Sequence, residues 1–320
     1  MKNIEVSVAI VTYKHENYIR KALDSVFMQK TNFEFEVIVG EDASPDSTRE
    51  ILLEYKEKYG DKLVLVLHDV NQGTSANSMS VHTRARGKYI AILEGDDFWT
   101  DEYKLQKQYD ILENNPRYSA VCHDFMSVLP DGTTKRSSVL NLKDDMIKTM
   151  DDWINDGYSL HTCTVFRKNF FPLHDPDYIK LRTAEPTMGD LISFTLMYDA
   201  GDIYLLKDVM SAHRIAGNED TSSFSYKQRE NAIKYTWMFI RIMKNLEVYL
   251  NHKYDLTPRI CNRIASVKSG KIQGVFKYPA KEMHEIMKTL SLKWRVVVYY
   301  KVIKKLINKF MSRLRSKHEG

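Results

Sequence analysis

The sequence predicts an α/β protein whose mostly parallel, Rossmann-like sheet is flanked by helices and followed by a helical C-terminal extension. Two observations predict this class. Apolar, β-rich runs alternate with segments of helical period through the first third of the 320 residues, as in βαβ units. From Tyr226 onward, strand patterns are absent and helical patterns dominate. Hydrophobic residues make up 43% and charged residues 28% of the chain, which indicates a globular rather than a disordered protein.

The first third of the chain predicts four strands and the helices that connect them. The strands are expected at 6–11, 35–39, 63–67 and 89–93, where apolar residues are continuous. Apolar positions between 18 and 27 recur at helical spacing and predict the first helix. The second helix is expected to begin in "SPDST", with Ser44 as N-cap and Pro45 at the first helical position. A third helix is expected at 76–86, and "DEYKLQKQYDILENN" predicts a fourth that ends near Pro116.

The middle of the chain predicts a different strand arrangement. "YSAVCHDFMSV" at 118–128 alternates like a strand, and "PDG" at 130–132 turns the chain, so mixed or antiparallel pairing is expected there. The later change to helical patterns indicates a domain boundary near 220–225. We therefore expect one domain over residues 1–222 and a helical region over residues 223–320.

Composition excludes several classes of protein. The three cysteines, Cys122, Cys163 and Cys261, are far apart and lack a C-x-x-C pair, which indicates neither a disulfide framework nor a zinc site. "MKNIEVSVAIVTYK" is typical of a first strand rather than of a secretion signal. No uncharged stretch approaches the roughly 20 residues that a membrane span needs. These features predict a cytoplasmic protein that does not cross a bilayer.

Two acidic clusters follow predicted strands. Glu41 and Asp42 close the second strand in "VIVGEDAS", and Glu94, Asp96 and Asp97 follow the fourth in "YIAILEGDDFWT". Ligands of open α/β sheets bind beyond the carboxyl ends of the strands, so both clusters are expected at one edge. Carboxylate oxygens suit Mg²⁺ or Mn²⁺, which a substrate diphosphate would bridge. Turn acids without a ligand are the alternative, and the absence of G-x-G-x-x-G and of a P-loop argues against a dehydrogenase and a P-loop enzyme.

Four ordered motifs carry a family resemblance. They are "SVAIVTYKHENYIRKALDSVFMQ", "FEVIVGEDASPDSTREIL", "NQG" and "ARGKYIAILEGDDFWTDEYKLQKQYDILENNP". Together they closely resemble the bacterial family 2 glycosyltransferases of the GT-A fold, strongly over about the first 125 residues and weakly to about residue 220. The resemblance implies a nucleotide-sugar donor, a UDP-sugar by preference, with a divalent cation (Mn²⁺ or Mg²⁺) and inversion at the anomeric carbon. It also implies a nucleotide-binding half at about 1–125 and an acceptor-side half at about 126–222.

The resemblance assigns roles to the residues at the strand ends. Thr12 and Tyr13 match the loop that cups the nucleobase, and Asp42 matches the acid that hydrogen-bonds a uracil edge. Three acids match the family's D-x-D-type motif, the first toward the ribose and the other two toward metal and diphosphate: Glu94, Asp96 and Asp97. Glu at position 94 departs from the commoner Asp.

The resemblance also implies a catalytic base and a cation for the leaving group. "AEPTMGDLISFTLMYDAG" matches the family's catalytic acid segment loosely, with Asp190 as the candidate base and Glu185 as second choice. An acid favoured by the dipole at a helix N-terminus is the alternative for Asp190. In "VMSAHRIAGNEDTSS", Arg214 is preferred over His213 as the diphosphate ligand, because a guanidinium binds phosphate oxygens through two donors. That segment lacks the glycine- and tryptophan-rich form that is usual in the family.

The sequence as a whole predicts an inverting, metal-dependent glycosyltransferase that transfers a sugar to an acceptor hydroxyl. A saccharide or lipid-linked saccharide acceptor, as in bacterial surface polysaccharide or glycolipid synthesis, is expected, and nucleic acid is not. Two alternatives stay open: a nucleotidyltransferase, which also combines an α/β nucleotide domain with carboxylate-bound Mg²⁺, and a non-catalytic, membrane-docked module that binds nucleotide sugars.

The C-terminal tail predicts a basic amphipathic helix at about 292–317. The formal net charge of +5 is uneven, because residues 293–317 contain nine Lys and Arg and no acid. Apolar residues follow helical spacing on one side: Val296, Tyr299, Tyr300, Ile303, Ile307, Phe310 and Leu314. Basic residues lie largely off that stripe: Lys301, Lys304, Lys305, Lys309 and Arg313. The tail is therefore expected to dock on the anionic inner face of the cell membrane, and packing on protein is the alternative.

Overall fold

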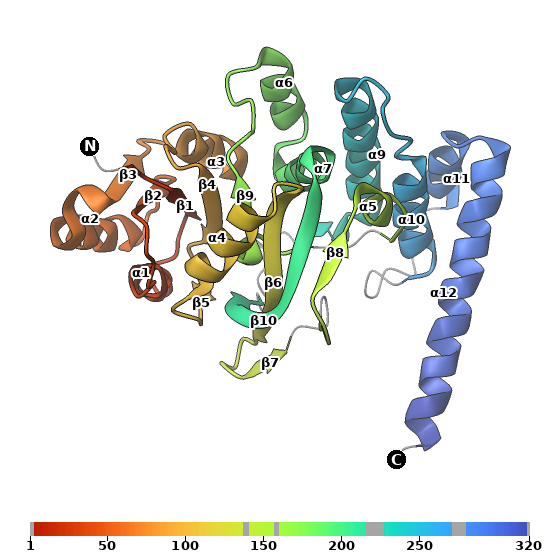
Figure 1. The fold of residues 1–320 in the computed structure, drawn as a ribbon. Coiled ribbons are helices and arrows are strands. Elements are labelled where there is room, and N and C mark those ends of the chain that lie inside the picture. The colour runs from red at the N-terminus through yellow and green to blue at the C-terminus, as the bar shows by residue number, and fades with distance from the viewer. Residues whose placement is uncertain are drawn as a thin grey trace. The chain divides into compact units, whose positions relative to one another are not determined.

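The computed structural model describes residues 3–136, 141–156, 160–215, 227–228, 230–270 and 280–318 (Figure 1). Its contacts divide the chain into two compact units. The first contains Met1–Met150 and Tyr158–Gly217, and the second contains Asp151–Gly157 and Asn218–Gly320. The strands of the described chain all lie in the first unit.

The first unit begins with four parallel strands in the spatial order β3-β2-β1-β4. Their bounds are β1 Val6–Thr12, β2 Phe35–Glu41, β3 Leu63–Leu67 and β4 Tyr89–Glu94. The helices between them are α1 Ile19–Phe27, α2 Thr48–Tyr59 with the short helix η1 Gly60–Lys62, and α3 Thr74–His82. All four strands lie where the sequence predicted them, because apolar side chains that are buried on both faces of a parallel sheet leave a continuous apolar run.

The rest of the sheet is mixed and continues in the order β4-β9-β6-β10-β5. The bounds are β5 Phe98–Trp99, β6 Tyr118–Val128, β7 Thr134–Arg136, β8 Met146–Lys148, β9 Phe166–Lys168 and β10 Asp202–Arg214. Strand β9 pairs antiparallel with both β4 and β6, whereas β10 runs parallel to β6. Strands β7 and β8 pair with β6 and β10, outside the main order. Mixed pairing in the middle of the chain is thus confirmed.

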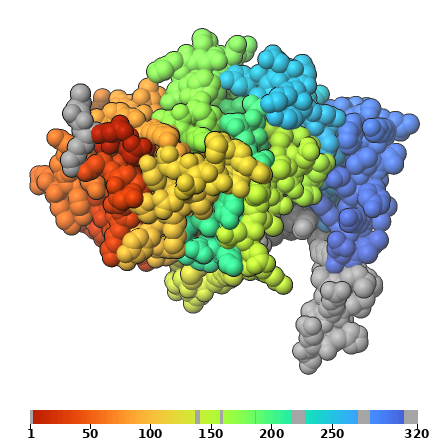
Figure 2. All heavy atoms as spheres, in the orientation of Figure 1, coloured from red at the N-terminus to blue at the C-terminus, as the bar shows by residue number. Residues whose placement is uncertain are grey.

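Helices cover both faces of the parallel half of the sheet. Side chains of α1, α2 and α4 (Lys104–Asn114) enter the larger core, with Leu23, Leu52 and Leu105 completely buried. Val81 of α3 packs with Ile38 and Ile90 in a smaller core on the opposite face. Figure 2 shows the red to yellow part of the chain, which contains these strands and helices, as one continuous body of atoms on the side in view. The remaining helical elements of this unit are η2 Thr162–Thr164, α6 Pro176–Ala184, η3 Pro186–Met188 and α7 Gly189–Ala200.

Helix α2 begins three residues later than the sequence predicted. The segment with Ser44 and Pro45 is a loop, and the helix begins at Thr48. The side chain of Ser44 accepts a hydrogen bond from the backbone N–H of Lys14 at 3.0 Å instead of capping a helix. Asp46 accepts from the N–H of Thr48 at 3.1 Å, as in an Asx turn that precedes a helix. A contact with a distant loop therefore overrides the local capping signal.

The second unit is helical in the part that the structure describes. It contains most of α5 Met150–Asp156, then α9 Ala232–Tyr249, α10 Thr257–Lys268, α11 Ala280–Lys288 and α12 Leu292–His318. The buried Val298 lies on α12, which packs against α10. Within the stretches that the structure describes, no helix combines the length and the hydropathy that a bilayer span requires.

Candidate active site

Three parallel strands end at one edge of the sheet and bring the predicted site residues together there. Thr12 at the end of β1 pairs with Glu41 of β2, and Val11 pairs with Glu94 of β4. The backbone N–H of Asp42 also donates to the Thr12 carbonyl at 3.2 Å. The two acidic clusters, more than fifty residues apart in sequence, thus lie along one edge as expected.

A tight turn at 94–97 carries the three acids that follow β4. The N–H of Gly95 donates to the Val11 carbonyl at 2.9 Å, and the N–H of Asp97 donates to the Glu94 carbonyl at 3.0 Å. Gly95 lies so close to β1 that a Cβ there would be 2.7 Å from Thr12 Oγ1 and from His15 Nδ1. Only glycine therefore lets the acidic turn pack against the end of β1.

The acids of this turn repel one another. Burial raises the pKa of Glu94 well above its usual value, and the carboxylates of Asp97 and Asp96 raise it further. A hydrogen bond from the Thr162 side chain opposes this shift. Glu94, Asp96 and Asp97 each have a carboxylate oxygen within 4.8 Å of those of the others. Such crowding is relieved when a cation binds between the carboxylates.

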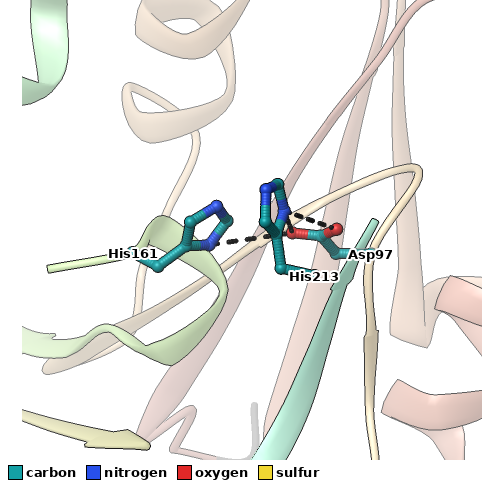
Figure 3. A group of neighbouring side chains, drawn as sticks. All are labelled: Asp97, His161 and His213. Carbon is teal, nitrogen blue, oxygen red and sulfur yellow. Dashed lines mark hydrogen bonds and ion pairs between the residues drawn. The ribbon is translucent and has the colours of Figure 1, made fainter. Parts of the chain in front are cut away.

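Asp97 is the most enclosed of these acids and has two histidine neighbours (Figure 3). His213 Nδ1 lies 3.2 Å from one carboxylate oxygen and 3.3 Å from the other. The backbone N–H of Arg214 donates to Asp97 at 2.9 Å, and His161 Nδ1 lies 3.8 Å away. Burial raises the pKa of Asp97, while the hydrogen bond and charge of His213 act in the opposite direction. Asp97 thus belongs to two groups of side chains that could hold a metal ion, one with Glu94 and Asp96 and one with His161 and His213.

His161 is a site neighbour that no pattern in the sequence predicts. It lies just before η2, and its ring centroid is 3.8 Å from that of His213. Burial holds the pKa of His161 well below its usual value, so the ring is neutral and able to act as a ligand. In the sequence it is a lone His with no ligand spacing to another His or acid. Only the pairing of β9 and β10 with their neighbours brings it to Asp97.

The residues predicted to bind the nucleobase lie in two loops that are joined by hydrogen bonds, from the Lys14 N–H to Ser44 and from the Asp42 N–H to Thr12. Tyr13 is exposed, and Thr12 Oγ1 lies 3.1 Å from His15 Nδ1. Lys14 and Ala43, one in each loop, have φ angles of 60° and 57°, which non-glycine residues rarely adopt. Asp42 is buried, and its carboxylate accepts hydrogen bonds from the backbone N–H groups of the "NQG" motif, at 2.7 Å from residue 72 and 2.9 Å from residue 73. In the protein alone, Asp42 therefore holds the 71–73 loop.

The candidate base, Asp190, lies in the first turn of α7. Its carboxylate helps to raise the pKa of Glu94, so it is near the acidic turn. Asp190 is exposed to solvent, yet the surrounding protein removes enough hydration to raise its pKa, and the charge of Arg182 opposes the rise. Arg182 donates from one nitrogen to the Gly189 carbonyl at 2.8 Å and to Ser193 Oγ at 3.0 Å, which fixes the start of α7. Glu185, the second choice, lies outside this turn, at the end of α6.

A sheet that begins with parallel βαβ units, continues with mixed strands and carries an acidic turn after its fourth strand has the GT-A fold of glycosyltransferases. The solved structure of TarS from Staphylococcus aureus, residues 1–349 with UDP-GlcNAc, matches this chain with a TM-score of 0.64. The match covers 95% of this chain and 89% of that chain at 17% identity. The expected fold class is thus confirmed.

The chain belongs to glycosyl transferase family 2, whose model matches residues 7–172, just over half of its length. An uncharacterized protein of Mycobacterium bovis is 31% identical over 218 residues, which are 65% of this chain. The matched part spans only 58% of that relative. TuaG of Bacillus subtilis, named as a teichuronic acid biosynthesis glycosyltransferase, is 26% identical over 75% of this chain and 95% of its own length.

Proposed function

We propose that this chain is an inverting, metal-dependent glycosyltransferase that moves a sugar from a nucleotide-diphosphate sugar, preferably a UDP-sugar, to an acceptor hydroxyl. The observation that carries the proposal is the acidic turn after β4, where Glu94, Asp96 and Asp97 have carboxylate oxygens within 4.8 Å of one another in a chain of glycosyl transferase family 2. The UDP-GlcNAc in the TarS structure and the teichuronic acid assignment of TuaG support a UDP-sugar donor and a bacterial surface polysaccharide as product.

The reaction is a single displacement in which this chain's residues orient the substrates and move one proton. Asp190 accepts the proton of the acceptor hydroxyl while the hydroxyl oxygen attacks the anomeric carbon. The bond from that carbon to the diphosphate oxygen breaks, and the nucleoside diphosphate leaves. A base in this position contributes typically about 10²–10⁴-fold. The raised pKa of Asp190 makes it a stronger base than an ordinary aspartate.

The residues at the turn fit a divalent cation. The fit is supported by the clustered carboxylate oxygens of Glu94, Asp96 and Asp97 and by the raised pKa values of Glu94 and Asp97. Asp96 and Asp97 would hold the ion, and His213 offers a nitrogen next to Asp97. Nitrogen ligands suit Mn²⁺ better than Mg²⁺, which prefers oxygen. When bound, such an ion acts as a Lewis acid that stabilises charge on the leaving diphosphate. Arg214 follows His213 and would bind the same diphosphate.

The proposal is tested by a thermal-shift screen of UDP-, GDP-, dTDP- and CDP-sugars with Mn²⁺, since a ligand of the folded state raises apparent stability. Product analysis separates the rivals. Release of nucleoside diphosphate supports the glycosyltransferase, whereas pyrophosphate indicates a nucleotidyltransferase. Donor binding with neither sugar transfer nor slow hydrolysis of the nucleotide sugar would favour the non-catalytic module.

Two matched variants test the metal site. Asp97→Asn should lose Mn²⁺-dependent binding of UDP in calorimetry. Asp101→Asn is the control, because Asp101 stabilises the turn before α4 by accepting from the Tyr103 N–H at 2.7 Å and pairs with Lys107 at 2.7 Å. It should lose mainly stability, by about 0.5–1.5 kcal/mol. Equal UDP affinity of Asp97→Asn and the wild type would refute the metal role.

We further propose that α12 docks the enzyme on an anionic membrane, where a lipid-linked acceptor would be found. Seven large apolar residues of α12 are exposed at helical spacing: Leu292, Val296, Tyr299, Tyr300, Ile303, Leu306 and Ile307. The other side of the helix packs on α10, where Lys301 Nζ donates to Asn262 Oδ1 at 2.7 Å. Lys309, Phe310, Arg313 and Leu314 have side chains outside the described part. Each basic residue near an anionic surface contributes about 1 kcal/mol.

Sedimentation with vesicles tests this docking in the full chain. Ile303→Glu with Ile307→Glu should abolish binding to anionic vesicles, because both residues lie on the exposed apolar face. Val248→Glu is the control, since Val248 is an equally exposed apolar residue on α9. If the double variant sediments like the wild type, or if the wild type binds no anionic vesicles at low salt, α12 is not a membrane anchor.

A further inference from the structure

Two cations from different elements meet at the ring of Phe98. Lys21 of α1 has its Nζ 3.7 Å from the centroid of this ring. Arg214, at the end of β10, has its guanidinium carbon 5.3 Å from the same centroid and 4.8 Å from that of Tyr18. Among the residues that the structure describes, no carboxylate forms an ion pair with either cation. Two like charges thus meet at one aromatic ring, and no carboxylate of the described chain separates them.

The arrangement is unfavourable for the protein by itself. Loss of hydration and the charge of Arg214 lower the pKa of Lys21, which shows that the ammonium lacks a compensating acid. A cation on an exposed aromatic ring gains only about 0.5–1 kcal/mol. Two neighbouring cations do have acidic partners: Arg20 pairs with Glu54 at 2.6 Å, and Lys30 pairs with Glu102 at 2.8 Å. Lys21 and Arg214 differ from these two in having no carboxylate partner among the described residues.

The pair adjoins the candidate metal site. Phe98 directly follows Asp97, and the backbone N–H of Arg214 donates to the Asp97 carboxylate at 2.9 Å. The Nε of Arg214 is buried and has no hydrogen-bond partner within the described chain. An unpaired guanidinium donor and an unpaired ammonium next to a metal site are suited to phosphate oxygens, which accept several charge-assisted hydrogen bonds at once.

We propose that Lys21 and Arg214 together form one binding site for a phosphate-type anion, so that Lys21 is a substrate-binding residue. This inference rests on the proposed function and adds a second cation, on α1, to the diphosphate role of Arg214. The anion has two sources with the same chemistry: the diphosphate of the donor, or an acidic group carried by the acceptor. The Phe98 ring lies beside both cations, and the Tyr18 ring lies beside Arg214.

Calorimetry with UDP and uridine in the presence of Mg²⁺ tests the donor source. Lys21→Gln should weaken UDP binding by about tenfold or more, the loss of one charge-assisted contact, and leave uridine binding unchanged. Lys21→Arg should restore part of the UDP affinity. Arg20→Gln is the matched control, because it removes a neighbouring cation that is paired with Glu54.

Ligand-observed NMR tests the acceptor source, with the protein saturated with UDP and Mg²⁺ and probed with glucose 1-phosphate and glucose. Selective loss of the glucose 1-phosphate signal in Lys21→Gln would assign the anion to the acceptor. If neither UDP nor glucose 1-phosphate distinguishes Lys21→Gln from the wild type, the inference is overturned. If the wild type binds no nucleotide, the proposed function fails instead, and titration with inorganic pyrophosphate still decides whether Lys21 and Arg214 bind an anion.

Discussion

Gly95→Ala should displace the acidic turn. We expect this variant to lose donor binding while the fold is kept. The added Cβ would lie 2.7 Å from Thr12 Oγ1 and His15 Nδ1, and 2.8 Å from Thr12 Cβ. Ordinary contacts of a Cβ begin at 3.4 Å, so the turn must move by about 0.7 Å. The atoms on the other side cannot easily yield, because Thr12 ends a buried central strand and its hydroxyl is tied to His15 at 3.1 Å.

Overpacking of this kind costs about 1–3 kcal/mol of folding free energy. The consequence for the site is larger, because a displacement approaching 1 Å costs up to about 10²-fold in rate when reacting groups are misaligned. Denaturant unfolding should therefore show a modest loss of stability, and calorimetry with UDP and Mn²⁺ should show a strong loss of affinity.

Gly132→Ala provides the matched control for this variant. Gly132 has φ +82° in a turn with no atom near the position of a Cβ, so alanine there costs roughly 1 kcal/mol of backbone strain and leaves the site untouched. Both variants should lose comparable stability, but only Gly95→Ala should lose UDP binding. Wild-type UDP affinity in Gly95→Ala would refute the argument that close packing of this turn positions the acids.

Variants at four further positions test the chemistry and one buried charge. Asp190→Asn should keep UDP binding and lose at least about 10²-fold in transfer rate. The positive charge of Arg182 lowers the pKa of Asp190, so Arg182→Gln should raise that pKa further. The acid limb of the pH–rate profile should therefore move to higher pH. Arg182→Lys keeps a positive charge and should move the limb partly back. Asp42→Ala should weaken UDP binding more than pyrophosphate binding and cost about 1–3 kcal/mol of stability, since two N–H groups of the 71–73 loop lose their acceptor. Burial lowers the pKa of Lys104 from 10.5 to about 7 in the folded protein, so the unfolded state binds more protons between these values. Stability of the wild type relative to Lys104→Met should then rise by about 1.4 kcal/mol per pH unit from about pH 7 to 10, and a flat difference would contradict this pKa.

Local patterns were sufficient to predict the parallel half of the sheet and the edge where its acids lie. Strand periodicity and βαβ order need no long-range contact, so the placement of Glu94 beside the end of β1 followed from the topology. The start of α2 could not be predicted in this way. Serine is a common N-cap residue, but the hydroxyl of Ser44 accepts a hydrogen bond from the backbone N–H of Lys14, thirty residues earlier.

The partners of Asp97 also could not be predicted from the sequence. His213 is 116 residues from Asp97, and the contact depends on β10 entering the sheet beside β6 and pairing with β5. His161 reaches the same acid from the segment before β9, and no spacing in the sequence connects it to the others. The burial of Lys104, whose ammonium donates to Gln108 at 2.7 Å and lies 4.2 Å from the Trp99 ring, likewise depends on a core formed by distant strands.

The charges around the acidic turn indicate what kind of ligand completes the site. Acids at 94–97 and the cations Lys21 and Arg214 lie side by side, and pairing them would relieve both the crowding of the carboxylates and the repulsion of the cations. The fold does not pair them in the part that is described: the backbone of Arg214 contacts Asp97, while its guanidinium is turned to the rings of Tyr18 and Phe98. A ligand of one sign would satisfy only half of this arrangement, because a free metal ion would face the cations and a free phosphate would face the acids. A diphosphate that carries a divalent cation would present positive charge to Asp96 and Asp97 and negative oxygens to Lys21 and Arg214, as proposed above. The separation of charges in the protein therefore favours the metal complex of a nucleoside diphosphate over either component alone, and calorimetry should find UDP and Mn²⁺ each binding more tightly in the presence of the other.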